Sequence, residues 1–235
     1  MSYGTFYSLD KSKKILVFDT SANACSAALW ANGEVACSCF QVMSRGHSEA
    51  LVPMIEEVFE KYDACDIDVG GLSAIAVTIG PGAFTGIRIG LATARALALP
   101  RRLPVIGLTN FDVVFWQAPK VKGLTLVVLE TKREDFYVQV FSENKEAVQG
   151  PMALTAEEIQ TRLPVEAITL VGDGAERLDQ ELVESGRKPS RLFSDVKPVA
   201  TEFAELASKR LDSGIYADPE PLYLRAPSVT SLARK

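Results

Sequence analysis

Apolar and polar positions alternate in short blocks along the first forty residues, and these blocks have the length of β-strands. Strands are predicted at 14–18, 26–30 and 35–42, where β-branched, aromatic and small apolar residues dominate. Asn32-Gly33 separates the second block from the third and fits a two-residue hairpin turn. The chain therefore opens with an antiparallel meander, and the polar segment 19–21 forms its first corner.

Between 48 and 62, apolar residues return every three or four positions, which is the period of a helix with one buried face. Leu51, Ile55 and Val58 mark that face, and glutamates occupy the opposite one. Ser48 is the expected N-cap, because its hydroxyl can accept a hydrogen bond from a free N–H of the first turn. This segment predicts an amphipathic helix.

The stretch 74–99 predicts a buried strand, a sharp turn and a second helix. The strand covers 74–79, glycine and proline break it at 80–82, and the helix runs from the expected N-cap Thr85 to Leu99. Small residues recur on this helix at every fourth position: Gly86, Gly90, Ala94 and Ala98. Such a stripe lets another backbone come close, and it fits two arrangements. Either it packs on the chain's own sheet, or one side of the helix packs on the sheet and another on a partner helix.

The second half of the chain repeats this order. Strands are predicted at 124–129 and 136–141 on either side of a charged turn, and a short strand at 168–171 follows later. Thr155 has the sequence position of a helix cap that begins a capping box, and Thr109 is another expected cap. Strands that alternate with helices in two similar halves predict a duplicated α/β fold.

The predicted fold divides into a leader, two lobes and a tail, and each lobe is long enough for a core of its own. The boundaries are a loose leader at 1–13, a first lobe at 14–107 joined by 201–217, a second lobe at 108–200, and an extended C-terminal tail at 218–235.

Composition restricts the class of protein. The 235 residues are 47% hydrophobic and 23% charged, as in ordinary globular domains, and the net charge is −5. A chain that binds nucleic acid alone usually carries a basic face, so this acidic balance argues against that role. No apolar run approaches the ~20 residues that cross a bilayer, and the four cysteines form no C-x-x-C pair. Cytoplasm is the expected location, with no membrane contact.

Several kinds of catalytic site are excluded by the residues themselves. The single histidine is His47, and Leu51 stands one turn later, where a zinc-binding pair needs a second histidine. No G-x-S-x-G motif marks a strained nucleophilic serine, and no surrounding sequence marks an activated thiol. We therefore expect no catalytic residue and no bound metal.

Phosphate binding is the chemistry that the sequence leaves open, because glycine turns and polar corners can point backbone N–H groups toward an anion. The candidate residues are Asp19, Thr20, Ser21, Gly80 and Gly82. None belongs to a Walker loop or a G-x-G-x-x-G fingerprint. The matching corner of the second half, Glu130 to Arg133, contains no glycine and is a poor cradle for a second phosphate.

Four segments carry a more specific pattern: I-L-V-F-D-T-S-A-N-A-C-S-A-A-L, S-R-G-H-S-E-A-L-V-P-M-I, I-G-P-G-A-F-T-G-I-R-I-G-L-A-T-A-R-A-L-A and P-L-Y-L-R-A-P. In this order and at this spacing they resemble the TsaB (YeaZ) family. The resemblance is dense from Ile15 to about Leu108, returns at the tail, and is loose from 120 to 199. It implies a two-lobed actin/hexokinase/Hsp70-like (ASKHA) fold, in which helices flank a mixed sheet in each lobe.

The resemblance also implies a role in making threonylcarbamoyladenosine, the modified base next to the anticodon of tRNA. In that family TsaD, which carries a metal-binding histidine pair and a nucleotide site, performs the transfer. TsaB is its non-catalytic scaffold, and TsaE is a third component with ATPase activity. The implied partners are a TsaD-like subunit, a TsaE-like ATPase and a second copy of the chain as a homodimer, with tRNA bound only through the complex.

The resemblance implies that the chain has no cofactor of its own. It also implies weak binding of ATP or ADP in the complex. The alternative is an ASKHA-type small-molecule kinase, which Asp19 beside the glycine turn would suit. At Glu130 to Arg133 the sequence departs from the D-A-R-like corner expected of relatives, which argues against a nucleotide role for the second lobe.

The resemblance places the partner interface on the two helices of the first lobe. The residues carried over as partner-facing are Leu51, Met54, Ile55, Val58, Gly86, Gly90 and Ala94. Their spacing does not decide which of them face the partner and which face the sheet.

Overall fold

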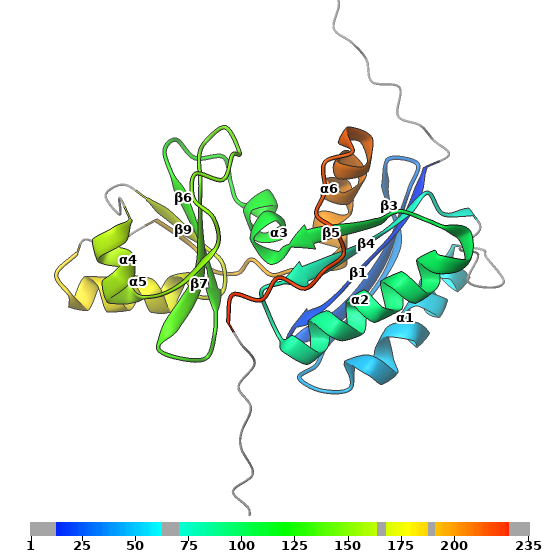
Figure 1. Ribbon diagram of the computed structural model, residues 1–235, viewed down its shortest axis with the longest axis horizontal. Coiled ribbons are helices and arrows are strands. Elements are labelled where there is room, and N and C mark those ends of the chain that lie inside the picture. The colour runs from blue at the N-terminus through cyan, green and yellow to red at the C-terminus, as the bar shows by residue number, and fades with distance from the viewer. Residues whose placement is uncertain (1–12, 63–70, 164–167, 188–190, 226–235) are drawn as a thin grey trace, which may run out of the picture.

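The computed structural model describes residues 13–62, 71–163, 168–187 and 191–225. Within these residues the chain forms two five-stranded sheets, one in each of two lobes that lie side by side (Figure 1). The predicted leader, apart from Lys13, lies outside the described residues, as do Cys65 and the last part of the predicted tail, 226–235.

The first sheet has the strand order β3-β2-β1-β4-β5. Its strands are β1 (Lys14–Ala22), β2 (Ala24–Ala31), β3 (Glu34–Val42), β4 (Ala74–Gly80) and β5 (Val105–Thr109). The first three are antiparallel neighbours, whereas β4 and β5 run parallel to β1. The predicted hairpin turn is confirmed, because Asn32 and Gly33 have the positive φ angles that it requires, 56° and 88°.

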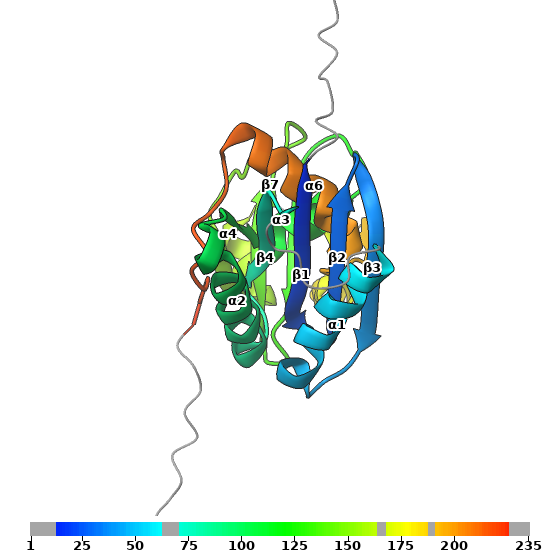
Figure 2. The same ribbon diagram turned by 90° about the vertical axis from the view of Figure 1, so that its right-hand side faces the viewer.

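Helices cover both faces of this sheet (Figure 2). Helices α1 (His47–Lys61) and α2 (Phe84–Ala98), the latter continued by a 3-10 turn at Leu99–Arg101, lie on one face, and α6 (Ala200–Ser213) lies on the other. Strand β1 therefore contributes alternate residues to two cores. Leu16 and Phe18 pack under α1 and α2, and Ile15 and Val17 pack under α6. No helix among the described residues has the length and apolar content needed to cross a membrane.

The second sheet has the strand order β10-β9-β6-β7-β8. Its elements are β6 (Thr125–Glu130), β7 (Asp135–Phe141), β8 (Met152–Thr155), α4 (Ala156–Arg162), β9 (Thr169–Val171), α5 (Ala175–Glu184) and β10 (Arg191–Phe193). As in the first sheet, three antiparallel strands precede two parallel ones, so the duplicated α/β fold is confirmed. The capping box at the start of α4, formed by Thr155 and Glu158, is also present.

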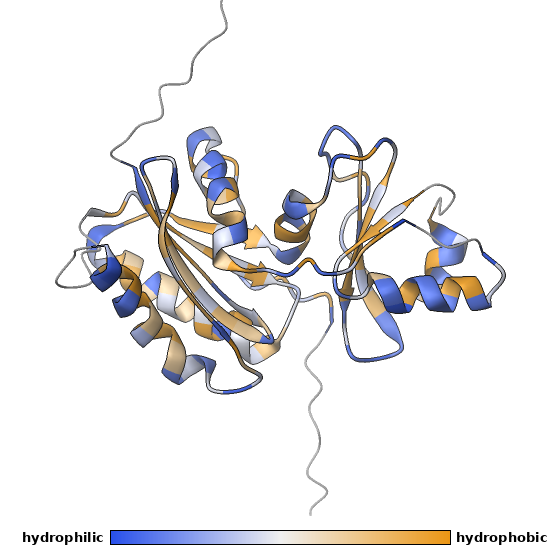
Figure 3. Cartoon of the chain, turned by 180° about the vertical axis from the view of Figure 1, so that it is seen from behind, coloured by the Kyte–Doolittle hydropathy of each residue, from blue (hydrophilic) through white to orange (hydrophobic). Residues whose placement is uncertain are grey.

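Helix α3 (Asn110–Gln117) joins the lobes, and Thr109 caps it as predicted by accepting a hydrogen bond from the N–H of Asp112. Its residues Phe111 and Val114 are fully buried in a core shared with β6, β7 and β9 of the second lobe. In Figure 3 the polar colours gather on the outer faces of the helices, while the strands are mostly apolar. The lobes thus meet through an apolar contact and not only through a linker.

Two predicted helix caps are wrong. Helix α1 begins at His47 after Gly46, which has a left-handed conformation with a φ of 86°, and Ser48 lies inside the helix. Helix α2 begins at Phe84, so Thr85 also lies inside its helix. Neither N-cap residue makes a side-chain hydrogen bond, because Gly46 and Ala83 have no polar side chain.

Candidate partner surface and interlobe cleft

The polar corner at the end of β1 is sealed inside the first lobe, since Asp19, Thr20 and Ser21 are each at most 2% exposed. Oδ1 of Asp19 accepts hydrogen bonds from the Ser21 N–H at 3.1 Å, from Ser21 Oγ at 2.5 Å and from the Thr78 hydroxyl. Burial raises the pKa of Asp19 to about 6, although these hydrogen bonds and His47 lower it. The carboxylate of Asp19 therefore points into the first lobe and not toward solvent.

The buried carboxyl of Asp19 makes stability depend on pH. In the pH range between the ordinary aspartate pKa of 3.8 and about 6, the folded chain keeps a proton that the unfolded chain has lost. The free energy of unfolding of the wild type, relative to Asp19→Asn, should fall by about 2 kcal/mol as the pH rises from 4 to 7. Urea denaturation across this range measures the difference.

The control for this experiment is Asp195→Asn, since the Asp195 side chain is 96% exposed. This variant should follow the wild-type pH curve. Parallel curves for the wild type and Asp19→Asn between pH 4 and 7 would contradict the raised pKa.

Helix α2 lies directly on β1, and glycine makes this approach possible. The Thr20 hydroxyl donates to the carbonyl oxygen of Gly86 at 2.7 Å. A Cβ atom on Gly86 would lie 1.9 Å from the carbonyl oxygen of Thr20, and one on Gly90 would lie 2.8 Å from Thr20 Oγ1. The small-residue stripe therefore packs on the chain's own sheet, and that another side of the helix packs on a partner stays a prediction.

The five candidate phosphate-binding residues come together, because β1 and β4 are parallel neighbours and both end at this corner. Asn110 ties the two loops by donating from Nδ2 to Ser21 Oγ and to the Pro81 carbonyl, each at 2.8 Å. A Cβ atom on Gly82 would lie 2.5 Å from the Ser21 carbonyl oxygen, so the loops touch backbone to backbone. A cis peptide bond joins Gly80 to Pro81. Of the five candidates, Ser21 and Gly82 line a cleft, whereas the others do not.

That cleft lies between the lobes and has a volume of about 530 Å³, which is the size of a small-molecule site. Its walls come from the first-lobe loops, the hairpin between β6 and β7, and the C-terminal segment. Lining residues include Ser21, Asn23, Gly82, Asn110, Glu130, Lys132, Arg133, Tyr223 and Arg225. The Lys132 Nζ lies 3.5 Å from Asn23 Oδ1 across the cleft.

The second-lobe corner is held by an ion pair. Arg177 donates from Nε and Nη2 to the two carboxylate oxygens of Glu130, at 2.9 and 2.8 Å. Burial raises the pKa of Glu130, but these hydrogen bonds and that from the Lys132 N–H outweigh it and leave the pKa below its usual value. Glu130 is thus a carboxylate at neutral pH, and its negative charge disfavours a phosphate group beside it.

The described cysteines offer no activated nucleophile. Burial, followed by the negative charge of Asp19, raises the pKa of the Cys25 thiol to about 11. Burial also raises the pKa values of Cys37 and Cys39. These thiols stay protonated at neutral pH and behave as small core residues.

The seven residues predicted to face a partner are taken up by the chain's own core. Leu51, Ile55, Val58 and Ala94 are 0% exposed, Met54 is 8% exposed, and Gly86 and Gly90 are buried. Their spacing thus marks the inner face of each helix, and that they contact a partner stays a prediction. That the partner interface lies on these two helices likewise stays a prediction.

The outer faces of α1 and α2 are neighbours on the surface of the first lobe (Figure 2). Their exposed residues include Val52, Pro53 and Glu56 of α1 and Arg88, Ala92, Arg95 and Ala96 of α2. Val52 is an exposed apolar side chain, and Ala92 and Ala96 are small residues one turn apart on the solvent side of α2. This pair is a second small-residue stripe, which four-residue spacing in the sequence could have indicated.

Comparison with known proteins finds a matching family model and two relatives that share one name. A family model described as TsaD, tRNA N6-adenosine threonylcarbamoyltransferase, matches residues 41–208. The tRNA threonylcarbamoyladenosine biosynthesis protein TsaB of Escherichia coli is 29% identical, over 90% of this chain and 94% of the relative. The protein of the same name from Haemophilus influenzae is also 29% identical, over 90% of this chain and 93% of its own.

A solved structure, YeaZ from Pseudomonas aeruginosa, superposes with a TM-score of 0.74 at 23% identity, and covers 90% of this chain and 100% of its own. This likeness confirms the two-lobed fold. Together with the relatives from E. coli and H. influenzae, it confirms the resemblance that the four sequence segments carry.

Proposed function

We propose that this chain, which belongs to the TsaD, tRNA N6-adenosine threonylcarbamoyltransferase, family, is the non-catalytic scaffold of a transferase complex. It would activate a TsaD-like catalytic subunit, which transfers threonylcarbamoyl to the adenosine next to the anticodon of tRNA. The names of the relatives support the pathway, because they are tRNA threonylcarbamoyladenosine biosynthesis proteins.

The observation that carries the non-catalytic role is the state of the corner at Asp19. A carboxylate that binds a magnesium ion or a reacting group needs a free oxygen facing the substrate. Asp19 is 1% exposed and its Oδ1 is engaged by Ser21 and Thr78. Its Oδ2 has no hydrogen-bond partner among the described residues, but it is buried and Asp19 does not line the cleft. Because Asp19 does not reach the cleft, no carboxylate of the described first-lobe residues lines it, and none is placed to act there as a general base.

The residues of this chain do not fit the metal that the resemblance assigns to TsaD. His47 is the single histidine of the sequence, and its Nε2 lies 3.1 Å from the Ala22 carbonyl oxygen. The described part of the chain contains no group of three or more His, Cys, Asp and Glu residues that could hold a metal ion. No step of the transfer is assigned to this chain.

In this proposal the TsaD-like partner binds the outer faces of α1 and α2. Ala92 and Ala96 let a partner helix come close, since the distance between packed helices depends on the side chains at the contact. Val52 adds exposed apolar area that such a contact would bury. The same surface would pair two copies into a homodimer when the partner is absent. A TsaE-like ATPase is the third component, tRNA contacts the chain only through the complex, and the complex works in the cytoplasm.

The proposal gives the chain no cofactor of its own, and any ATP or ADP binds weakly and in the complex. Calorimetric titration of the isolated chain with ATP and Mg²⁺ separates this role from the alternative small-molecule kinase. We expect no saturable heat, which corresponds to a dissociation constant of about 1 mM or weaker. Micromolar binding that Asp19→Asn abolishes would contradict the proposal and support the kinase.

A further inference from the structure

Residues 217–225, here called the strap, run from the first lobe to the second (Figure 1). On the first lobe the Gly107 N–H donates to the Ala217 carbonyl at 3.1 Å, and the Leu222 N–H donates to the Ile79 carbonyl at 2.8 Å. A Cβ atom on Gly107 would lie 2.8 Å from the Ala217 oxygen, and one on Gly80 would lie 3.0 Å from the Leu222 oxygen. Glycine at these two positions leaves room for the strap's backbone.

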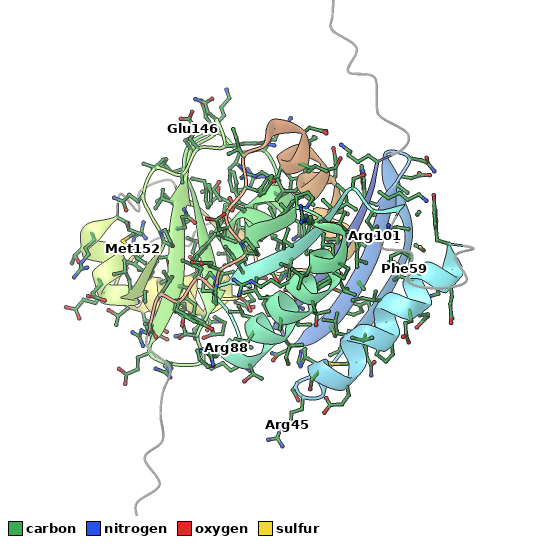
Figure 4. All side chains as sticks on the ribbon, turned by 45° about the vertical axis from the view of Figure 1, so that its right-hand side comes forward. Arg45, Phe59, Arg88, Arg101, Glu146 and Met152 are labelled. Atoms are coloured by element: carbon green, nitrogen blue, oxygen red, sulfur yellow. The ribbon has the colours of Figure 1, made fainter. Side chains whose placement is uncertain are left out.

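Helix α2 holds the strap from the side. The Nε of Arg88 donates to the Tyr223 hydroxyl at 2.9 Å, and the ring of Phe84 lies 5.0 Å from the Tyr223 ring between centroids. Arg95 donates to the Pro219 carbonyl at 2.5 Å. Figure 4 labels Arg88 on α2, the helix that carries both arginines. Both the backbone and the side chains of the strap therefore have fixed partners on the first lobe.

On the second lobe the strap ends in an ion pair between an exposed arginine and a buried aspartate. Arg225 forms an ion pair with Asp135, whose side chain is 3% exposed. The guanidinium of Arg225 contacts Oδ2 of Asp135, so it compensates a charge that would be costly to bury alone. Leu224 packs against the apolar core between the lobes, next to residues such as Phe111 and Leu129.

We propose that the strap is a tie between the lobes, with Leu222-Tyr223-Leu224-Arg225 anchored at one end on β4 and α2 and at the other on Asp135. By contacting both lobes, the strap holds them at a fixed separation. These four residues also form one wall of the cleft, so the strap sets the space that remains for any other ligand.

The test uses the full chain and two single substitutions, Arg225→Ala and Asp135→Asn, together with the double variant. Two measurements are made: amide hydrogen exchange at Leu222, and the distance distribution between non-cysteine spin labels at the exposed positions Glu60 and Gln160. Each single variant should speed exchange at Leu222 about tenfold and broaden the distance distribution. The double variant should do no more than either single one, because both remove the same contact.

The matched control is Arg45→Ala. The Arg45 side chain points away from the lobe into solvent in Figure 4, so both measurements should equal those of the wild type. If Asp135→Asn fails to fold, Arg225→Ala decides alone, because Arg225 is the more exposed member of the pair. Wild-type exchange at Leu222 in Arg225→Ala would overturn the pair of Arg225 and Asp135 as the anchor of the strap. Faster exchange with an unchanged distance distribution would overturn the role in holding the lobes.

Discussion

Gly86→Ala is expected to destabilise the fold by about 3 kcal/mol or more, even though alanine favours a helix by about 1 kcal/mol over glycine. The added methyl carbon would lie 1.9 Å from the Thr20 carbonyl oxygen and 3.0 Å from its carbon. Both atoms belong to the backbone of β1, the central strand of the sheet, so they cannot rotate away as a side chain could. Urea denaturation monitored by circular dichroism measures the loss.

Gly150→Ala is the matched control, because a Cβ atom there would have no neighbour within 4 Å. Its stability should stay within about 0.5 kcal/mol of the wild type. A Gly86→Ala variant that is more stable than the wild type would show that the helix gains its propensity without a clash. That result would contradict the seating of α2 on β1.

Ala92→Arg is expected to abolish pairing with the TsaD-like subunit while the fold stays intact. Ala92 is exposed, and arginine is nearly as good a helix former as alanine, so the free chain should lose little stability. In a close contact between helices, the long charged side chain would force the backbones apart. We expect an affinity loss of about 100-fold or more, which corresponds to about 3 kcal/mol. Size-exclusion chromatography of the mixed subunits measures it.

Ala147→Arg places the same side chain at an exposed alanine of the second lobe, away from α1 and α2. This control variant should pair like the wild type. If Ala92→Arg also pairs like the wild type, the outer face of α2 is not the contact surface, whatever else the chain does.

Much of the fold could be predicted from the sequence, because its signals are local. Apolar runs gave the strands of both sheets, and Asn32-Gly33 gave the first hairpin through the φ angles that this turn needs. The repeated order of strands in the second half indicated the duplication. The starts of α1 and α2 were missed because Gly46 and Ala83 precede them without a side-chain hydrogen bond.

The candidate site was harder to predict, because helical spacing identifies a face but not its neighbour. Gly90 and Ala94 mark one stripe and Ala92 and Ala96 another, and the sequence does not say which one the sheet covers. The contact between Thr20 and Gly86 joins residues far apart in the chain, so the structure was needed to resolve it.

The sequence predicted an extended tail at 218–235, but it did not predict where the strap is anchored. Its backbone is anchored by hydrogen bonds to β4 and β5, and nothing in residues 217–225 themselves encodes those partners. The signal lies elsewhere, in Gly80 and Gly107, where a side chain would collide with the strap's carbonyl oxygens.

In the role proposed above, this chain supplies a surface to an enzyme and no chemistry of its own. The most direct test is threonylcarbamoyl transfer to tRNA by the TsaD-like and TsaE-like subunits, assayed without the chain, with the wild type and with Ala92→Arg. Transfer should require the wild-type chain and should fall to the level without it when Ala92→Arg is used. Equal transfer in all three reactions, or turnover by the isolated chain, would contradict the claim.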